Sequence, residues 1–391
     1  MKDVFIASPV RTPIMKFGGA AKSMLASDLA QFPVKEVLKR TAIDPGALDD
    51  VIFGSCFMRS DDINTARCAL LKAGIPVHVP GVTIQRQCSS SMQALVYAAT
   101  QIQTDSADMI LVGGAEVMSS CLYVSKDMRW GRRLQHSELT DALWEGLADP
   151  LGGYMMGITA ENLAEKYGIS REEQDIIALR SHANAGAASR EGRFKEEIVP
   201  VVIQERRREV VLEADEHFRD DLTLEGLGKL AAAFKPGGTV TSGNASGIND
   251  GAAALLVLSE DACKRHNVTP IARLVSHAVA GVEPELMGYG PVPATHKALK
   301  RAGKQLQDID LIEINEAFAA QYLACEKGLE LNREITNVNG SGIGLGHPVG
   351  ATGLRIIVTL VHELKRRNKR LGLASLCVGG GMGKTTIWEM V

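Results

Sequence analysis

The chain has 391 residues with a formal net charge of −3, and 45% of its residues are hydrophobic and 23% charged. This composition is ordinary for a soluble globular protein of two or three structural units, and the small net charge gives no electrostatic basis for binding nucleic acid or an anionic membrane. The seven cysteines are irregularly spaced, which indicates reduced thiols in a cytoplasm-like compartment. No secretion signal, no apolar run of about 18 residues and no C-x-x-C or H-x-x-x-H pattern is found, so we expect no membrane span and no metal site.

Short apolar runs bounded by glycine or polar residues predict buried strands along the whole chain. These runs are residues 51–53, 82–84, 109–112, 253–258, 311–314 and 373–378. Between them, apolar residues recur at helical spacing from Met92 and again from Leu354. Strands that alternate with helices predict a mostly parallel sheet covered on both faces.

Two parts of the chain resemble each other in this pattern. Residues 34–54 and 295–315 both read as an amphipathic helix, a turn with an acidic pair, and a strand. Residues 83–114 and 335–380 both continue through a helix to a strand that ends in Val-Gly-Gly. We interpret this as an internal duplication. Residues 118–249 fit neither copy and indicate an insertion in the first one, of the kind that usually carries binding or assembly contacts.

Two residues occupy matching positions in the two copies. Cys88 lies between a predicted strand and a predicted helix, where free N–H groups and the helix dipole favour a thiolate, the nucleophile that attacks thioesters. The alternative is a buried structural cysteine, which is the commonest fate of this residue. His347, in GHPVGATG, stands at the matching junction of the second copy. Its alternative reading is an ordinary polar loop residue.

The ends of two further strands carry candidate groups. Cys377 closes the final predicted strand and enters CVGGGMG, where successive N–H groups form a nest for an oxyanion. Asn315 follows another strand, at the end where open α/β sheets usually place ligands. Residues 383–385 resemble the end of a phosphate-binding loop, but too few residues follow for its helix, so we do not expect a nucleotide triphosphatase.

Seven motifs occur together in one order: CSSSMQA from Cys88, GGAEVMS from Gly113, MGITAEN from Met156, GNASGINDGAA from Gly243, NEAFAAQ from Asn315, GHPVGATG from Gly346 and CVGGGMG from Cys377. With these motifs the chain resembles the thiolase family over essentially its whole length. The resemblance implies an α/β thiolase fold of five layers, αβαβα, built from two duplicated halves. The halves would be residues 1–117 with 250–270, and residues 271–391. Residues 118–249 would form an inserted loop domain for CoA binding and oligomer contacts.

The resemblance also implies roles for five residues of the site. Cys88 would be the acylated nucleophile, and Cys377 the acid/base that serves the substrate α-carbon and the CoA thiol. His347 would activate Cys88 and help to hold a thioester oxygen, with a water positioned by Asn315. The backbone N–H groups of Cys88 and Gly379 would form a second oxyanion hole. Contacts to substrate or CoA are implied at Ser246, Arg219, Met155, Phe234, Met287 and Phe318.

The implied activity is reversible thiolysis or Claisen condensation of 3-ketoacyl-CoA through an acyl-cysteine, with ping-pong kinetics. Acetoacetyl-CoA and two acetyl-CoA are the expected reactants; degradation of longer or unusual acyl chains is the alternative, and a non-catalytic acyl-CoA-binding protein is a third. CoA would be a substrate, and no other cofactor, metal, nucleic acid or membrane partner is expected. A cytoplasmic homotetramer, a dimer of dimers, is implied.

The chain departs from the family pattern close to the nucleophile. Gln85 stands where the family usually has asparagine, and Ser91 where it usually has glycine. Because serine adds a Cβ where the family's glycine has none, we predict that Ser91→Gly changes kcat/KM or acyl preference. Met155 is typical of degradative members, since short-chain biosynthetic members have histidine there, whereas Met287 and Phe234 suit an acetoacetyl-CoA pocket. The chain-length markers therefore disagree.

Overall fold

The computed structural model describes residues 2–205 and 208–391. One large sheet contains ten strands: β1 (Val4–Arg11), β2 (Met15–Lys16), β3 (Asp50–Gly54), β4 (Val82–Ile84), β5 (Met109–Val117), β10 (Asn249–Ser259), β11 (Ala272–Gly281), β12 (Leu311–Ile314), β13 (Leu371–Val378) and β14 (Met382–Met390). Their order is β12-β13-β14-β11-β1-β10-β5-β3-β4, and β2 pairs with β10. Every strand predicted from an apolar run is confirmed.

The sheet consists of two parts that meet at a narrow junction. Strands β1 and β11 pair only through Phe5 with Arg273 and Ile6 with Ala272. The prediction of a mostly parallel sheet is wrong, because only the β3–β4, β3–β5 and β12–β13 pairs are parallel. Helical crossovers make those three pairs parallel, whereas β13 and β14 follow each other through a tight glycine turn, which requires an antiparallel pair.

The helices are α1 (Ala26–Thr41), α2 (Thr65–Lys72), α3 (Ser90–Gln103), α4 (Ala142–Gly146), α5 (Met156–Tyr167), α6 (Arg171–Arg190), α7 (Leu224–Gly228), α8 (Glu260–Arg265), α9 (Pro291–Ala302), α10 (Ala319–Leu329), α11 (Gly342–Leu345) and α12 (Val349–Arg366). Short 3₁₀ turns lie at Ala20–Ser23, Pro45–Ala47, Met118–Ser120, Pro284–Tyr289 and Leu306–Asp308. Within the described ranges, no helix has the length and apolar character needed to cross a membrane.

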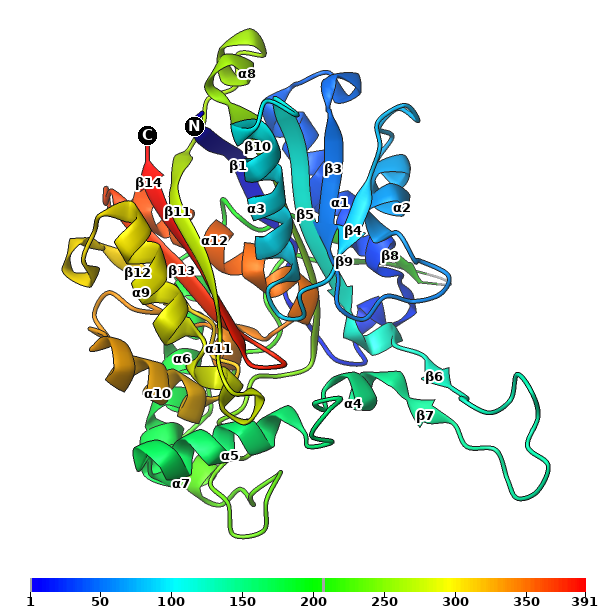
Figure 1. The fold of residues 1–391 in the computed structure, drawn as a ribbon, viewed down its shortest axis with the longest axis vertical. Coiled ribbons are helices and arrows are strands. Elements are labelled where there is room, and N and C mark those ends of the chain that lie inside the picture. Colours follow the sequence, from blue (N-terminus) through cyan, green and yellow to red (C-terminus); the bar gives the residue numbers. More distant parts are fainter. Residues whose placement is uncertain (1, 206–207) are drawn as a thin grey trace.

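Helices α3 and α12 form a central layer between the two parts of the sheet. Leu95 of α3 and Ile357 of α12 share a buried cluster with Val257 of β10 and Leu376 of β13. In Figure 1, α12 (orange) lies in the middle of the molecule, between the blue N-terminal strands and the red C-terminal ones. The first three turns of α12 are buried on all sides, and they include the buried Thr352 and Arg355 as well as apolar residues.

Outer helices complete the layers. Helices α1 and α2 cover the far face of the N-terminal strands in one buried cluster, and α9 and α10 cover the C-terminal strands in another. The order from one side to the other is helices, sheet, helices, sheet, helices. This confirms the predicted αβαβα fold with two similar halves.

The chain between β5 and β10 packs on both halves, with α5 and α6 against the second half and β8 against the first. It contains α4 to α7 and two small hairpins, β6 (Tyr123–Val124) with β7 (Thr140–Asp141) and β8 (Val201–Glu205) with β9 (Arg208–Leu212). Leu163 of α5 and Ile177 of α6 belong to the same buried cluster as Tyr322 of α10. The β6–β7 hairpin extends away from the body (Figure 1). The exact division at residues 117/118 and 249/250 stays a prediction.

Candidate active site

A narrow cavity lies where the two halves meet. Its volume is about 80 Å³. Six of the predicted site residues line it: Cys88, His347, Gly379, Ser246, Met287 and Phe318. The first three come from loops that follow β4, precede α12 and follow β13, so the duplicated halves contribute jointly to one site.

Cys88 lies in a tight turn between β4 and α3, which begins two residues later at Ser90. The preceding residue, Gln87, has a φ of 42°. The Ser90 hydroxyl donates to the Gln87 carbonyl at 2.6 Å and accepts from the Arg86 N–H at 2.9 Å. Burial raises the pKa of the Cys88 thiol to about 11, opposed by the backbone N–H groups of Gly379 and Cys88. Cys88 is therefore a thiol at neutral pH, contrary to the expectation from its helix N-terminus, and needs a base.

His347 lines the same cavity as Cys88. Its Nδ1 lies 2.7 Å from the Thr352 hydroxyl, and that hydroxyl donates to the Pro348 carbonyl at 2.9 Å. Since a hydroxyl has one proton to give, Thr352 accepts from Nδ1–H, and the lone pair of His347 is on Nε2. Burial lowers the pKa of His347 to about 3, so the ring is neutral and free to take a proton.

The backbone of His347 is held by a chain of hydrogen bonds that begins in the inserted segment. The Asn249 carboxamide oxygen accepts from the His347 N–H at 3.1 Å, and its nitrogen donates to the Met15 carbonyl. That nitrogen also lies 3.2 Å from Nδ1 of His217. Burial lowers the pKa of His217, so its Nδ1 accepts as a neutral ring. His217 thus links residues 118–249 to the position of His347.

Glu116, at the end of β5, joins the two halves beside the cavity. Its carboxylate accepts from the N–H groups of Cys56, Phe57 and Gly350 at 2.8–3.0 Å and contacts the Ser55 hydroxyl. Burial raises its pKa to about 7, and these donors oppose the rise. Because Gly350 belongs to the first turn of α12, the carboxylate fixes the helix that begins after His347.

Cys377 and Asn315 lie behind the cavity wall. Cys377 is fully buried on β13 opposite Gly383. Burial and the neighbouring Cys88 raise its pKa well above the ordinary thiol range, so its thiol is protonated at neutral pH. Asn315 follows β12, and its N–H donates to the Ser375 carbonyl at 3.0 Å. Its buried carboxamide has no hydrogen-bond partner among the described residues, and such a group requires water or a ligand.

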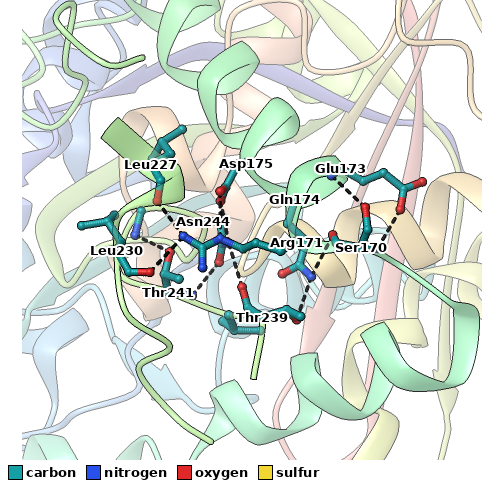
Figure 2. A network of polar contacts seen from close by, with 12 residues as sticks. Ser170, Arg171, Glu173, Gln174, Asp175, Leu227, Leu230, Thr239, Thr241 and Asn244 are labelled. Atoms are coloured by element: carbon teal, nitrogen blue, oxygen red, sulfur yellow. Dashed lines mark hydrogen bonds and ion pairs between the residues drawn. The ribbon is translucent and has the colours of Figure 1, made fainter. Parts of the chain in front are cut away.

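A polar network positions the loop that carries Ser246. Figure 2 shows Arg171 at the start of α6 bonded to Asp175 and to the Leu227 carbonyl, at 2.8 and 2.6 Å. The Asn244 carboxamide donates to Asp175 at 2.9 Å. Two residues on, the Ser246 N–H donates to the Ala317 carbonyl. Contacts within the inserted segment and with Ala317 of the second half therefore together place Ser246 at the cavity wall.

Three predicted contact residues do not line the cavity. Met155 is the residue before α5, and its neighbour Met156 faces the cavity instead. Phe234 packs edge-on against Phe318, with ring centroids 6.0 Å apart, and so supports the wall from behind. Arg219 is exposed on the inserted segment, away from the cavity.

Ser91, which has a Cβ where the family usually has glycine, also lies outside the cavity. It is fully buried in α3, and its hydroxyl accepts from the Leu354 N–H of α12 at 2.9 Å. It therefore joins the two central helices. Gln85 is exposed, and its carboxamide nitrogen lies 3.8 Å from the Cys56 sulfur.

Residues missed from the sequence include Gln87, Phe57 and Glu116. Gln87 and Phe57 line the cavity, and Glu116 fixes its walls. Position after the carboxyl end of β3 could have identified Phe57. Gln87 could have been identified because it directly precedes Cys88. Nothing in the sequence alone pairs Glu116 with Gly350, 234 residues away.

Comparison with known proteins agrees with this geometry. The family models "Thiolase, N-terminal domain" and "Thiolase, C-terminal domain" match residues 4–261 and 268–390. The chain belongs to the thiolase family. Acetyl-CoA acetyltransferase of Escherichia coli is 48% identical over 100% of this chain and 99% of its own length. Human mitochondrial 3-ketoacyl-CoA thiolase is 45% identical over 99% and 98%.

Solved thiolase-family structures match equally well. The crystal structure of the Bacillus anthracis acetyl-CoA acetyltransferase superposes with a TM-score of 0.99 and 54% identity, covering 100% of this chain and 99% of that one. The human mitochondrial 3-ketoacyl-CoA thiolase in complex with CoA gives 0.96 and 44% identity, covering 100% and 98%. Structures named acetyl-CoA acetyltransferase and 3-ketoacyl-CoA thiolase thus both superpose closely on this thiolase.

Proposed function

We propose that this thiolase interconverts 3-ketoacyl-CoA plus CoA with two acyl-CoA molecules through an acyl-Cys88 intermediate. The observation that carries the proposal is the meeting of Cys88, a neutral His347 and the Gly379 N–H at one cavity. Buried thiols beside a base and fixed N–H donors suit acyl transfer between thioesters. A non-catalytic acyl-CoA-binding protein has no need of this arrangement.

In the first half-reaction, the Cys88 sulfur attacks the thioester carbonyl of acetyl-CoA. Since the thiol pKa is about 11, the proton moves to Nε2 of His347 as the bond to carbon forms. The N–H groups of Cys88 and Gly379 stabilise the developing oxyanion. The C–S bond to CoA then breaks, and Cys377 protonates the CoA thiolate. Acetyl-Cys88, a Cys377 thiolate and an imidazolium at His347 remain.

In the second half-reaction, the Cys377 thiolate takes the α-proton of a second acetyl-CoA. His347 and a water held by the unpartnered Asn315 carboxamide stabilise the enolate oxygen. The α-carbon attacks the acetyl-Cys88 carbonyl, the Cys88 sulfur leaves, and the imidazolium returns its proton to that sulfur. Every proton is restored, and thiolysis runs through the same steps in reverse.

The size of the cavity favours a short acyl group. Its volume of about 80 Å³ corresponds to roughly five to eight water positions at roughly 10–15 Å³ each. Acetyl transfer and acetoacetyl-CoA fit this space, so acetyl-CoA acetyltransferase activity is the proposed function. Degradation of longer acyl chains is the second candidate, because the human 3-ketoacyl-CoA thiolase is nearly as similar as the acetyltransferases.

Two further expectations become proposals with their own support. Trp130, Leu134 and Leu151 are 91, 78 and 92% exposed on the inserted segment, and exposed apolar side chains in such number support contacts with other copies in a homotetramer. Arg219, exposed on the same segment, would contact the CoA nucleotide. Seven free cysteines support a reducing, cytoplasmic location.

Thiolysis assays on acyl chains of increasing length test the function. We expect cleavage of acetoacetyl-CoA by CoA, with kcat/KM falling as the acyl chain grows. Cys377→Ala should abolish turnover and still accept an acetyl group at Cys88 more slowly. A rise of kcat/KM with chain length would favour the degradative function. Absence of turnover with every chain would favour the binding protein.

A further inference from the structure

Gln87 places a polar side chain inside the acyl cavity, directly before the nucleophile. It lines the cavity together with Cys88 and Gly379. Its backbone has a φ of 42°, a left-handed conformation that is uncommon for a residue other than glycine. Two bonds to its carbonyl, from the N–H and the hydroxyl of Ser90, hold the turn in this conformation.

The carboxamide of Gln87 lies against the backbone of Gly379. A Cβ on Gly379 would come within 2.1 Å of the Gln87 Oε1. The absent side chain at position 379 therefore makes the room that the carboxamide occupies. The Gly379 N–H is a proposed donor to the oxygen of the acyl carbonyl. The Gln87 carboxamide, next to Gly379, would therefore lie close to the part of the acyl chain beyond that carbonyl.

The oxygen of this carboxamide needs a hydrogen-bond donor. The Oε1 atom is buried, and no donor among the described residues reaches it. The nearby walls are apolar, from Phe57, Leu147 and Met156. A buried polar atom left without a partner is unfavourable, so a partner must come from whatever enters the cavity.

We propose that Gln87 determines acyl specificity by binding a hydroxyl group on a short acyl chain. The inference rests on the proposed acylation of Cys88. A hydroxyl donates to an amide oxygen and accepts from an amide N–H, so it suits either end of the carboxamide. A plain alkyl chain of equal length leaves Oε1 without a donor or traps a water beside it. The cost is a rate difference of roughly two- to tenfold.

Matched acyl donors test the proposal without changing chain length. Glycolyl-CoA and propionyl-CoA differ by a hydroxyl in place of a methyl group, and 3-hydroxypropionyl-CoA and butyryl-CoA differ in the same way one carbon further out. For each pair we would measure kcat/KM for acyl transfer to Cys88, by release of CoA and intact mass. The hydroxyl-to-alkyl ratio of the wild type is then divided by that of Gln87→Met, which cancels the intrinsic reactivity of each thioester.

The wild type should exceed Gln87→Met in this ratio by roughly two- to tenfold for at least one pair. The exposed Gln307 provides a matched control, since Gln307→Met should keep the wild-type ratio. Gln87→Leu serves as a second apolar variant if the methionine variant is unstable. Equal ratios in wild type and both variants would overturn the proposal. Acetylation of Cys88 with equal ratios refutes only the specificity, whereas no acylation by any thioester refutes the proposed function itself.

Discussion

Removal of the Thr352 hydroxyl gives a sharp test of how His347 is controlled. Thr352→Val keeps the shape of the side chain and deletes the acceptor that lies 2.7 Å from Nδ1. The ring is then free to carry its proton on Nε2, which removes the lone pair that faces Cys88 in the proposed reaction. In the other tautomer of the variant the lone pair stays on Nε2. The imidazolium that forms in the transition state then has no hydrogen-bond acceptor for its Nδ1–H.

A hydrogen bond to a charged group contributes about 1.5–3 kcal/mol, and about 1.4 kcal/mol corresponds to a tenfold change in rate. We therefore expect acylation of Cys88 to slow roughly ten- to 150-fold. Because the bond strengthens only as the ring becomes charged, the loss should appear in kcat more than in KM.

The assay is the burst of CoA released when enzyme is mixed with acetyl-CoA. Thr352→Ser keeps a hydroxyl and should retain most of the rate. Thr359→Val removes another buried hydroxyl from α12, one that donates to Glu197 at 3.0 Å, and should leave the burst unchanged. A wild-type burst rate in Thr352→Val, with the variant folded by circular dichroism, would show that Thr352 does not control the base.

Three more changes test the packing. Burial lowers the pKa of Lys384 from 10.5 to about 7. Between these two pH values Lys384 is neutral in the folded protein but protonated in the unfolded chain, so stability increases with pH. From pH 7 to 10 the free energy of unfolding should rise by about 1.4 kcal/mol per pH unit relative to Lys384→Met. A Cβ at Gly350 would come within 2.6 Å of Glu116, so Gly350→Ala should lower both melting temperature and turnover, whereas Gly228→Ala, with open space around it, should do neither. Arg11 is buried between two carboxylates, and Arg11→Met should destabilise the fold by about 3–5 kcal/mol in urea unfolding; a loss below 1 kcal/mol would contradict this.

Much of the fold follows from local signals in the sequence. Apolar runs and helical spacing located the strands and the central helices, because burial imposes those patterns directly. Strand direction was not accessible in this way. The antiparallel returns of β10 and β14 depend on which strands become neighbours, and the run of apolar residues in β10 reads the same in either direction.

For the site too, local signals in the sequence predict some features, whereas others depend on tertiary contacts. Cys88, His347 and Cys377 could be predicted because each ends or begins an element and carries distinctive chemistry. The family pattern points to Met155, whereas Met156 lines the cavity, because a shift of one residue decides whether a side chain precedes α5 or faces the cavity from its first turn. The thiol state of Cys88 could not be predicted, since burial by both halves outweighs the local helix N-terminus.

Intact-mass analysis after brief exposure to acetyl-CoA tests the central claim most directly. We predict that the wild type gains the mass of one acetyl group, that peptide mapping places it on Cys88, and that added CoA removes it. Cys88→Ala should gain nothing. An acetyl group on another residue, or a wild type that stays unmodified while it turns over acetoacetyl-CoA, would contradict an acyl-Cys88 intermediate.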